Sequence, residues 1–326
     1  MTAFGINCQL TTIPYNSGIV GMKRGPFFAM LAFFLAPALI IYCTFAVYPL
    51  VATIINSLYT KTADGTLVWI GLGNFTTLLG DETWSKPFWN AFWNNCVFFL
   101  IHMVVQNPVG LMLAALLSLP RLRLRAAYRT MIFMPTMLSV VVIGFIWQLI
   151  LSPLWGVAKL FLSSVGLGFL FAPWLGQESS ALLTVSLISV WQFVGIPMIL
   201  IYTALLAIPE DLTDAATVDG LNQFQIFRRI KLPLIWPTLG LISVLTFVNN
   251  FNAFDLIYAM KGALAGPNYS TDIMGTLFYR TFFGNQLQLG DVTMGSTIAT
   301  MMFLIILVGV MIYLFAIQRR LQRHSF

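Results

Sequence analysis

Charged side chains are scarce in this sequence of 326 residues. They make up 9% of the chain, whereas hydrophobic residues make up 59%. A soluble domain carries about 25% charged residues, because its surface has to be hydrated. The composition therefore excludes a water-soluble globular protein and predicts a polytopic membrane protein whose outer surface is solvated by lipid. The net charge of +6 does not indicate nucleic-acid binding, since Lys and Arg residues beside membrane spans commonly set the orientation of the chain.

Cysteine and histidine are also rare, which limits the chemistry open to the chain. Cys8, Cys43 and Cys96 have no metal-ligand spacing, so we predict neither a disulfide framework nor a metal site. His102 and His324 are the only histidines, and no nucleophile–base pair or H-E-x-x-H pattern accompanies them. No G-x-x-x-x-G-K-[ST] phosphate loop is present either. We therefore expect a chain that is not an enzyme, carries no cofactor and does not itself bind ATP through such a loop.

Six apolar stretches are long enough to cross a membrane, for which a helix needs about 20 mostly apolar residues. They run over residues 27–52, 92–119, 131–152, 181–207, 237–260 and 293–317. Pro108, Pro135 and Pro197 lie within these stretches and are expected to kink the helices, because proline lacks the backbone donor. The sequence therefore predicts an all-α membrane protein with six transmembrane helices.

Basic residues are unevenly distributed between the segments that connect these spans. With a cytoplasmic N-terminus, six spans return the C-terminus to the same side, and 12 of the 17 Lys and Arg residues are then cytoplasmic. These are Lys23, Arg24, Arg121, Arg123, Arg125, Arg129, Arg228, Arg229, Lys231, Arg319, Arg320 and Arg323. Cytoplasmic segments are enriched in Lys and Arg, so we expect both termini on the cytoplasmic side of the membrane. The predicted domains are an N-terminal tail (1–26), a six-helix domain (27–318) and a basic C-terminal tail (319–326).

The cytoplasmic segment 208–234, between the fourth and fifth spans, has the pattern of a helix, a sharp turn and a second helix. Pro209 suits the first turn of a helix, and the two acidic residues after it complement the helix dipole. Asp219-Gly220 is a turn dipeptide in which the glycine can adopt a positive φ. Apolar residues then recur at helical spacing up to Pro233, which we expect to end the second helix.

This segment resembles the EAA loop of permeases of binding-protein-dependent ABC importers, whose consensus is close to E-A-A-x-x-D-G-A followed by F-x-x-I-x-L-P. The resemblance rests on Asp214, Ala215, Ala216, Asp219, Gly220, Phe224, Ile230, Leu232 and Pro233, with Arg228 on the polar side of the second helix. Asp214 stands in place of the usual Glu, and Leu221 in place of the usual Ala. The resemblance implies a type I ABC importer permease whose helix-turn-helix loop couples it to a cytoplasmic ATPase.

Other segments are similar to the carbohydrate branch of the family, the maltose and glycerol-phosphate permease type. They include Ile70 to Phe75, Phe88 to Asn94, Arg129 with Pro135 and Trp147, Trp191-Gln192, Phe254-Asp255 and Gly266-Pro267. The resemblance covers the chain from about residue 27 onward. It implies a sugar or sugar-like solute and a place in a bacterial cell (inner) membrane. The implied partners are an external binding protein, two ATPase copies that hold ATP and Mg, and a second permease subunit, usually a different chain.

Polar side chains inside the spans are candidates for the solute pathway, because such residues are costly in lipid and face a cavity or another helix. Asn249, Asn252 and Asp255 follow an i, i+3, i+6 spacing and are predicted to form a ridge along the fifth span. Trp191 and Gln192 lie in the fourth span. Asn95, His102 and Gln106 share one face of the second span and are weaker candidates. For each of them, a hydrogen bond between helices is the alternative interpretation.

Two other classes of protein remain to be compared with an importer permease. An ion-gradient-driven secondary transporter of a small polar solute commonly has inverted repeats and paired broken helices, and the sequence pattern indicates neither. A membrane enzyme is disfavoured because no convergent catalytic set is present. A co-purifying ATPase distinguishes the importer from the secondary transporter.

Overall fold

The computed structural model describes residues 24–62, 64–119 and 122–318. Most of the predicted N-terminal tail, the predicted C-terminal tail 319–326, and Lys23 and Arg121 lie outside these residues. The chain divides into two compact units, with the boundary after Ala52. The first unit contains α1 (Arg24–Tyr42), the π-helical turn η1 (Cys43–Val47) and the start of α2 (Tyr48–Asn56). Its large hydrophobic side chains from Phe33 to Val51 are exposed, as expected for a helix solvated by lipid.

The second unit begins within α2 and contains all the remaining elements. After α2, β1 (Tyr59–Lys61) pairs antiparallel with β2 (Leu67–Trp69). The helices in its first half are α3 (Gly73–Gly80), α4 (Glu82–Ile101), η2 (His102–Gln106), α5 (Asn107–Leu117), α6 (Arg125–Met137), α7 (Val140–Ile150), α8 (Val157–Ser164) and η3 (Gly168–Leu170). The remaining helices are α9 (Glu178–Phe193), α10 (Gly195–Leu206), α11 (Glu210–Val218), α12 (Gln223–Ile226), η4 (Phe227–Lys231), α13 (Leu232–Leu234), α14 (Trp236–Phe251), α15 (Asp255–Lys261), α16 (Met274–Phe283), α17 (Val292–Ile312) and η5 (Tyr313–Gln318).

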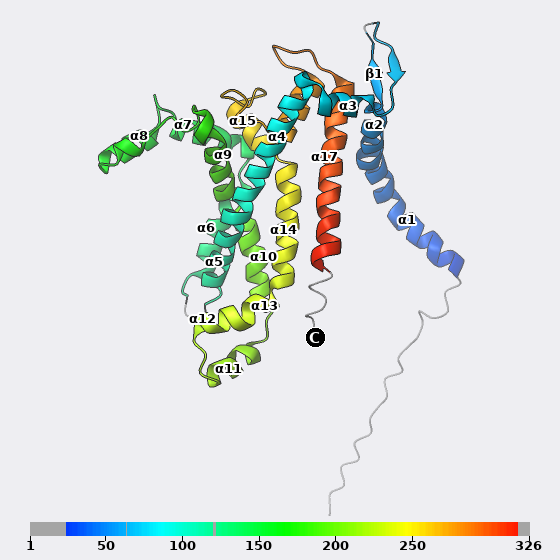
Figure 1. Cartoon of the computed structure of the whole chain (residues 1–326). Helices are drawn as coiled ribbons and strands as arrows, with labels where there is room; N and C mark the ends of the chain where they lie inside the picture. Colours follow the sequence, from blue (N-terminus) through cyan, green and yellow to red (C-terminus); the bar gives the residue numbers. More distant parts are fainter. Residues whose placement is uncertain (1–23, 63, 120–121, 319–326) are drawn as a thin grey trace, which may run out of the picture. The chain divides into compact units, whose positions relative to one another are not determined.

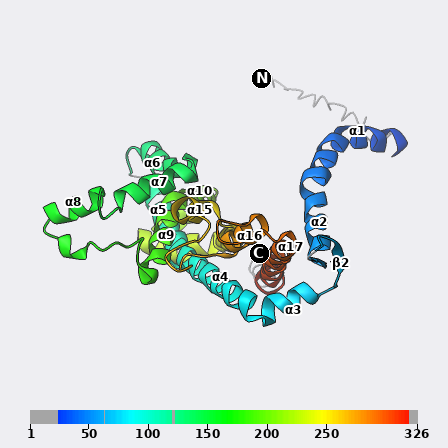
Figure 2. The ribbon, with the colours of Figure 1, turned by 90° about the horizontal axis from the view of Figure 1, so that it is seen from above.

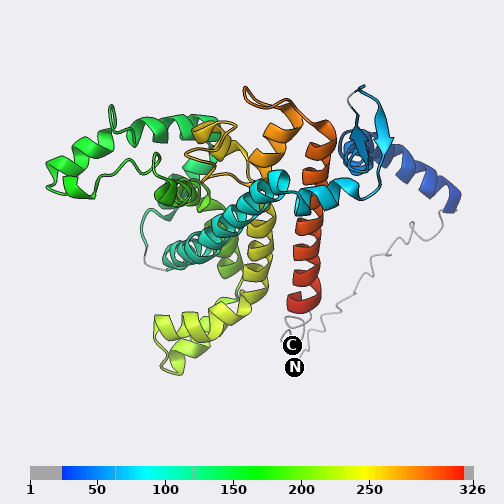
Figure 3. The same ribbon diagram turned by 45° about the horizontal axis from the view of Figure 1, so that its top comes forward.

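The long helices of the second unit form a bundle with distinct ends. Helices α4, α9, α10, α14 and α17 run between the two ends, α11, α12 and α13 lie at one end, and α15 and α16 lie at the other (Figures 1 and 3). Seen along the bundle, α8 extends away from it (Figure 2). The all-α fold predicted from the sequence is confirmed.

Four helical segments of the described chain are long and apolar enough to span a membrane, and two bent pairs bring the number to six if each pair is one span. The four are Ala32–Asn56, Glu82–Leu117, Trp236–Lys261 and Val292–Phe315. The second of these starts ten residues before the predicted boundary, because the aromatic and polar residues 82–91 continue the helix. The bent pairs are α6 with α7 and α9 with α10.

The third predicted span, 131–152, is wrong as one continuous helix. It breaks at Leu138 and Ser139, which are not helical, and the chain bends by 95° between α6 and α7. Pro135 lies one turn before the break. The buried side chain of Gln192 donates a hydrogen bond to the freed carbonyl of Leu138 (3.3 Å). Non-helical backbone at membrane depth is tolerated where protein groups satisfy it in this way.

Three prolines lie in helices directly after a π-helical turn. The π-helical turns η1, η2 and η4 each end two residues before Pro49, Pro108 and Pro233, respectively. A proline cannot donate to the carbonyl four residues earlier, and its ring clashes with that carbonyl, so a π-bulge relieves the crowding. The prediction that Pro233 ends the second coupling helix is therefore wrong, since α13 continues past it and α14 follows after Ile235.

Small residues allow the long helices to approach one another. A Cβ atom at Gly110 of α5 would lie 3.1 Å from the ring of Pro197 and 3.2 Å from the backbone nitrogen of Met198. The core beside this contact contains Ala114, Met198, Ile201 and Ile242 from α5, α10 and α14. Without a strong hydrophobic driving force in lipid, close packing of this kind is what holds membrane helices together.

Candidate functional site

The coupling segment has the predicted helix-turn-helix structure. Helix α11 ends at Val218, Gly220 adopts φ +83° in the turn, and α12 begins at Gln223. A Cβ atom at Gly220 would meet no atom within 4 Å, so only the backbone conformation favours glycine there. Asn222 and Gln225 form a capping box that the sequence analysis missed, with both hydrogen bonds at 2.9 Å. The N-x-x-Q spacing was the available signal.

The two alanines of the motif have different surroundings. Ala216 is buried, with 4% of its surface exposed, whereas Ala215 and Asp214 face solvent. Arg228 and Asp219 are exposed, and Ile230 and Leu232 are half-buried. The largest apolar group on this surface is Phe224, which is 70% exposed. A protruding aromatic residue on a polar, helical surface is suited to insertion into a partner protein.

The coupling helices also contact the end of α5. A cavity of about 400 Å³ is lined by Leu116 and Leu119 on one side and by Phe224, Phe227 and Lys231 on the other. The connection that follows α5 and the coupling segment therefore lie at the same end of the bundle. Both are among the segments in which the sequence concentrates Lys and Arg.

A polar cavity of about 370 Å³ lies within the bundle. Its polar lining residues are His102, Gln106, Ser189, Thr246, Asn249, Asn250, Asn252 and Asp255. The predicted ridge is thus gathered in one cavity, and its three side chains are exposed. It does not follow one helix, however. Helix α14 ends at Phe251 and α15 begins at Asp255, so Asn252 lies in the break between them.

The neighbouring Asn250 has a structural role that contrasts with the ridge. It is buried, its side-chain amide donates to the carbonyl of Thr246 (2.7 Å), and its own carbonyl accepts from Asn95 (2.8 Å). Asn95 in turn accepts from the backbone nitrogen of Met274 (2.9 Å). Asn95 therefore joins α4, α14 and α16, and it does not line the cavity. Its role as a pathway residue finds no geometric support.

His102 and Gln106 do line the cavity, although both are buried. The two ring nitrogens of His102 are hydrogen-bonded, to the Phe98 carbonyl (2.7 Å) and to the Ser189 hydroxyl (2.9 Å). Among the described residues, the side-chain oxygen of Gln106 has no partner. Of the two, Gln106 retains an acceptor that a solute hydroxyl can use.

Trp191 and Gln192 lie outside the cavity. The ring of Trp191 is 44% exposed and makes an edge-to-face contact with Trp147, with a centroid distance of 5.5 Å. Gln192 is fully buried and donates to the Leu138 carbonyl at the break described above. The structure thus brings Asn249, Asn252 and Asp255 together and separates Trp191 and Gln192 from them.

Aromatic rings border the break between α14 and α15. Phe254 lines the cavity and stacks on Tyr258, with a centroid distance of 4.9 Å and an interplanar angle of 28°. Tyr279 of α16 lies 5.0 Å from Phe254 and 4.9 Å from Tyr258. Amides, a carboxylate and aromatic faces are therefore available within one region, which is the combination that suits the hydroxyl groups and C–H faces of a sugar.

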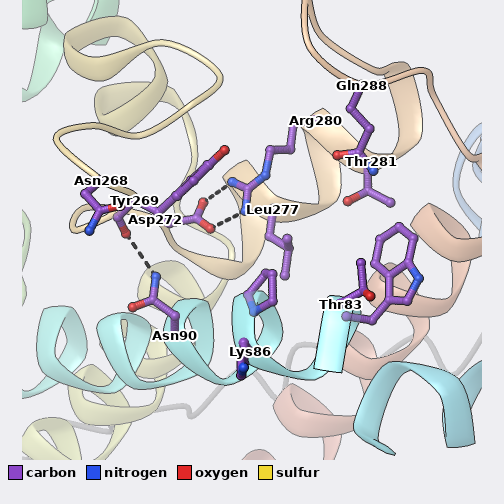
Figure 4. Close-up of a pocket in the computed structure, with 12 residues that line it drawn as sticks. Thr83, Lys86, Asn90, Asn268, Tyr269, Asp272, Leu277, Arg280, Thr281 and Gln288 are labelled. Carbon is purple, nitrogen blue, oxygen red and sulfur yellow. Dashed lines mark hydrogen bonds and ion pairs between the residues drawn. The ribbon is translucent and has the colours of Figure 1, made fainter. Parts of the chain in front are cut away.

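A second polar cluster, which the sequence analysis missed, lies around the start of α16 and includes Asp272, Arg280 and Tyr269 (Figure 4). Asp272 and Arg280 form a bidentate ion pair with both N–O distances at 2.6 Å, and both residues are buried. The Arg280 guanidinium lies 4.8 Å from the ring centroid of Tyr269. Burial raises the pKa of the Asp272 carboxyl, while hydrogen bonds and charge from Arg280 and a hydrogen bond from Thr276 act in the opposite direction.

Two asparagines of α4 hold the segment before α16, which carries Asp272. The side chain of Asn94 donates to the Asp272 carbonyl (2.8 Å), and that of Asn90 donates to the Tyr269 carbonyl (2.9 Å). The cluster borders a cavity of about 430 Å³. Across the described residues, no group of three or more His, Cys, Asp or Glu side chains is arranged to hold a metal ion.

Comparison with known proteins identifies relatives over most of the chain. Residues 106–324 match the family described as "Binding-protein-dependent transport system inner membrane component". The trehalose/maltose transport system permease protein MalF of Thermococcus litoralis is 28% identical over 282 residues, which cover 85% of this chain and 90% of that protein. The lactose transport system permease protein LacF of Rhizobium radiobacter is 29% identical over 251 residues, covering 77% of this chain and 82% of that protein.

The fold has a counterpart among solved structures. A chain of a bacterial alginate ABC transporter, crystallised with an alginate pentasaccharide-bound periplasmic protein, superposes with a TM-score of 0.74. The match covers 87% of this chain and 92% of that chain at 23% sequence identity.

Proposed function

The chain belongs to the binding-protein-dependent transport system inner membrane component family, and from this premise we propose its place in the importer. It is a multi-pass membrane protein and a permease subunit of an ABC importer for sugars. It is a transport subunit and not an enzyme. An ion-gradient-driven transporter is not favoured. Within the importer, we place this chain as one half of the translocation pathway, working with an ATPase and an external binding protein.

The finer assembly is part of the proposal. Two ATPase copies hold ATP and Mg²⁺, and one of them docks on α11 to α13. A second permease subunit, a different chain, forms the other half of the pathway. The solute is a neutral sugar of the kind named for the relatives, trehalose, maltose or lactose. Both termini lie on the ATPase side, which the concentration of Lys and Arg at the coupling end supports.

The coupling segment is the observation that carries the proposal. It places an exposed Phe224 and an exposed Ala215 on a compact double helix at one end of the bundle. Helix α14 begins two residues after α13 ends, so a displacement of the docked segment is passed along α14. A helix of this length extends about 24 Å, and its far end carries Asn249. ATP-driven motion of the partner can therefore reach the polar cavity along a single element.

Phe224→Ala is expected to weaken ATPase binding at least tenfold while leaving the permease folded. The phenyl ring is 70% exposed, so its removal leaves no cavity in this chain but removes an aromatic anchor from an interface, where such groups contribute about 2 kcal/mol or more. The measurement is the amount of ATPase that co-purifies with the tagged permease, together with ATP turnover after reconstitution.

The matched control is Phe283→Ala, which removes another exposed phenyl ring, 63% exposed, from the end remote from the coupling helices. It should leave ATPase recovery unchanged. If both variants retain the ATPase, Phe224 is not an anchor. If the wild-type chain recovers no ATPase, the assignment to an ATP-driven importer fails, and a secondary transporter regains favour.

The three ridge residues are expected to be accessible from water in the assembled importer. Single cysteines at Asn249, Asn252 or Asp255 should react with a small aqueous thiol reagent, since all three side chains are exposed in the cavity. A cysteine at Asn250, which is 5% exposed, should react at least tenfold more slowly and provides the control. Uniform protection at all four positions would remove the ridge from the pathway.

A further inference from the structure

We propose that the cavity between α5 and the coupling helices is a groove that holds one anionic phospholipid from the leaflet on the coupling side. An acyl chain of the lipid lies along α5, and its phosphate lies beside Lys231. Such a site needs only a multi-pass membrane protein, so it is independent of the proposed importer assembly. The charge of the groove, its depth in the membrane and the side of the bundle on which it opens support this occupant.

The groove is apolar along most of its wall and basic at one end. The apolar wall includes Leu111, Met112, Leu116, Leu119, Phe224 and Phe227. The basic end contains Lys231, and an adjoining cavity that shares Phe224 is lined by Arg228 and Arg229. No acidic residue is among the described residues that line either cavity, and the three basic side chains form no ion pair within the described chain. An apolar groove that ends at unpaired positive charges matches an acyl chain with an anionic headgroup.

The two ends of the groove lie at different depths in the membrane. Leu111 and Met112 belong to the apolar helical segment that ends at Leu117, whereas Lys231 lies just before the segment that begins at Trp236. Trp236 is 56% exposed, and tryptophan is enriched at the level of the lipid headgroups. Lys231 is therefore placed among headgroups, and Leu111 and Met112 are placed among acyl chains. A soluble ATPase does not reach that depth, so it can cover only the basic end.

The groove opens on the outer side of α5, away from the polar cavity. Gly110 lies against Pro197 of α10, which also lines the polar cavity, and Ala114 belongs to the same packed core. Met112 and Leu116 each follow one of these small residues by two positions, so they point about 200° away from it around the helix. They are 54% and 50% exposed. A second permease subunit that completes the pathway around the polar cavity therefore leaves the groove to lipid.

Quenching by brominated lipids tests the site at one position. The full chain, with any subunits that co-purify, carries Leu116→Cys labelled with bimane, and its three native cysteines are replaced by serine. In vesicles of phosphatidylglycerol and phosphatidylcholine, quenching by brominated phosphatidylglycerol gives its binding constant relative to phosphatidylcholine. We expect a value of about 10, because each basic residue near the membrane surface strengthens the binding of an anionic lipid about fivefold. Lys231→Gln should lower the value about fivefold, and Lys231→Arg should retain it.

Leu304→Cys supplies the matched control, because Leu304 is an exposed leucine of α17 (41%) that lies outside the groove. Its relative binding constant should be near 1, with or without Lys231. Arg129→Gln removes a charge from α6 and should leave the value at Leu116 unchanged. A value near 1 at Leu116, the same value at Leu304, or equal effects of Lys231→Gln and Arg129→Gln overturns the proposal. Absence of quenching by either lipid also overturns it and shows that a protein subunit covers the groove.

Discussion

Gly220→Val is expected to abolish sugar-stimulated ATP hydrolysis while leaving membrane insertion intact. Gly220 adopts φ +83°, a conformation that costs a β-branched residue about 1–3 kcal/mol. The added side chain would meet no neighbouring atom, so the variant relieves its strain by changing the turn and thereby the relative placement of α11 and α12. That placement presents Ala215 and Phe224 to the ATPase. The measurement is ATP turnover in the reconstituted complex with binding protein and sugar.

Gly80→Val provides the control for the Gly220 variant. Gly80 lies at the end of α3, outside the left-handed region, and a Cβ atom there also meets nothing within 4 Å. The same side chain is therefore added without backbone strain, and turnover should stay near the wild-type value. Gly220→Ala should give an intermediate loss. Normal coupling in Gly220→Val would show that the turn is a simple connection between two spans.

Arg280→Met is expected to destabilise the permease by about 3–5 kcal/mol, the usual cost of leaving one partner of a buried ion pair uncompensated. Asp272 is fully buried, and without Arg280 its charge has no counterion at that position. The measurement is the midpoint of thermal unfolding of the purified complex. The double variant Asp272→Leu/Arg280→Met removes both charges and should recover much of the loss.

The pH dependence of the Arg280 variant distinguishes a lost charge pair from lost packing. Burial raises the pKa of the Asp272 carboxyl, and removal of Arg280 removes the main opposing influence. A carboxyl whose pKa is higher in the folded state than in the unfolded state stabilises the fold only while it is protonated. The unfolding midpoint of Arg280→Met should therefore rise as the pH falls towards 5. A deficit that is constant across this range would indicate packing alone.

The parts of the molecule that sequence analysis identified are those specified by local patterns. The coupling turn follows from Asp219-Gly220 within a short segment, and the structure gives Gly220 the positive φ that a turn glycine permits. The sequence also predicted a group of polar residues in the fifth span, because Asn249, Asn252 and Asp255 stand among apolar residues. Local spacing, however, implied a continuous ridge, and the backbone between Phe251 and Asp255 is not helical.

The parts that sequence analysis missed depend on contacts between distant segments. Pro135 predicted a kink in the stretch 131–152, but not a full break at Leu138, where the free carbonyl accepts a hydrogen bond from Gln192 of another helix. The ion pair of Asp272 and Arg280 could not be predicted either, because its surroundings depend on α4, whose Asn94 donates to the Asp272 carbonyl. Trp191 and Gln192 were chosen for their polarity within a span, and tertiary packing assigns them to helix contacts outside the cavity.

The break between α14 and α15 means that Asn249 and Asp255, which both line the cavity, lie on two helices with different attachments. Helix α15 is anchored to α7, since Gln148 donates to the carbonyls of Ala259 and Met260, and Gly144 lies directly against Ala259. Helix α14, in contrast, is joined to the coupling helices. Under the proposed function, a tilt of α14 by the ATPase therefore moves Asn249 relative to Asp255, which stays with α7. The cavity then changes its shape at the break between the two helices, without any change within either helix.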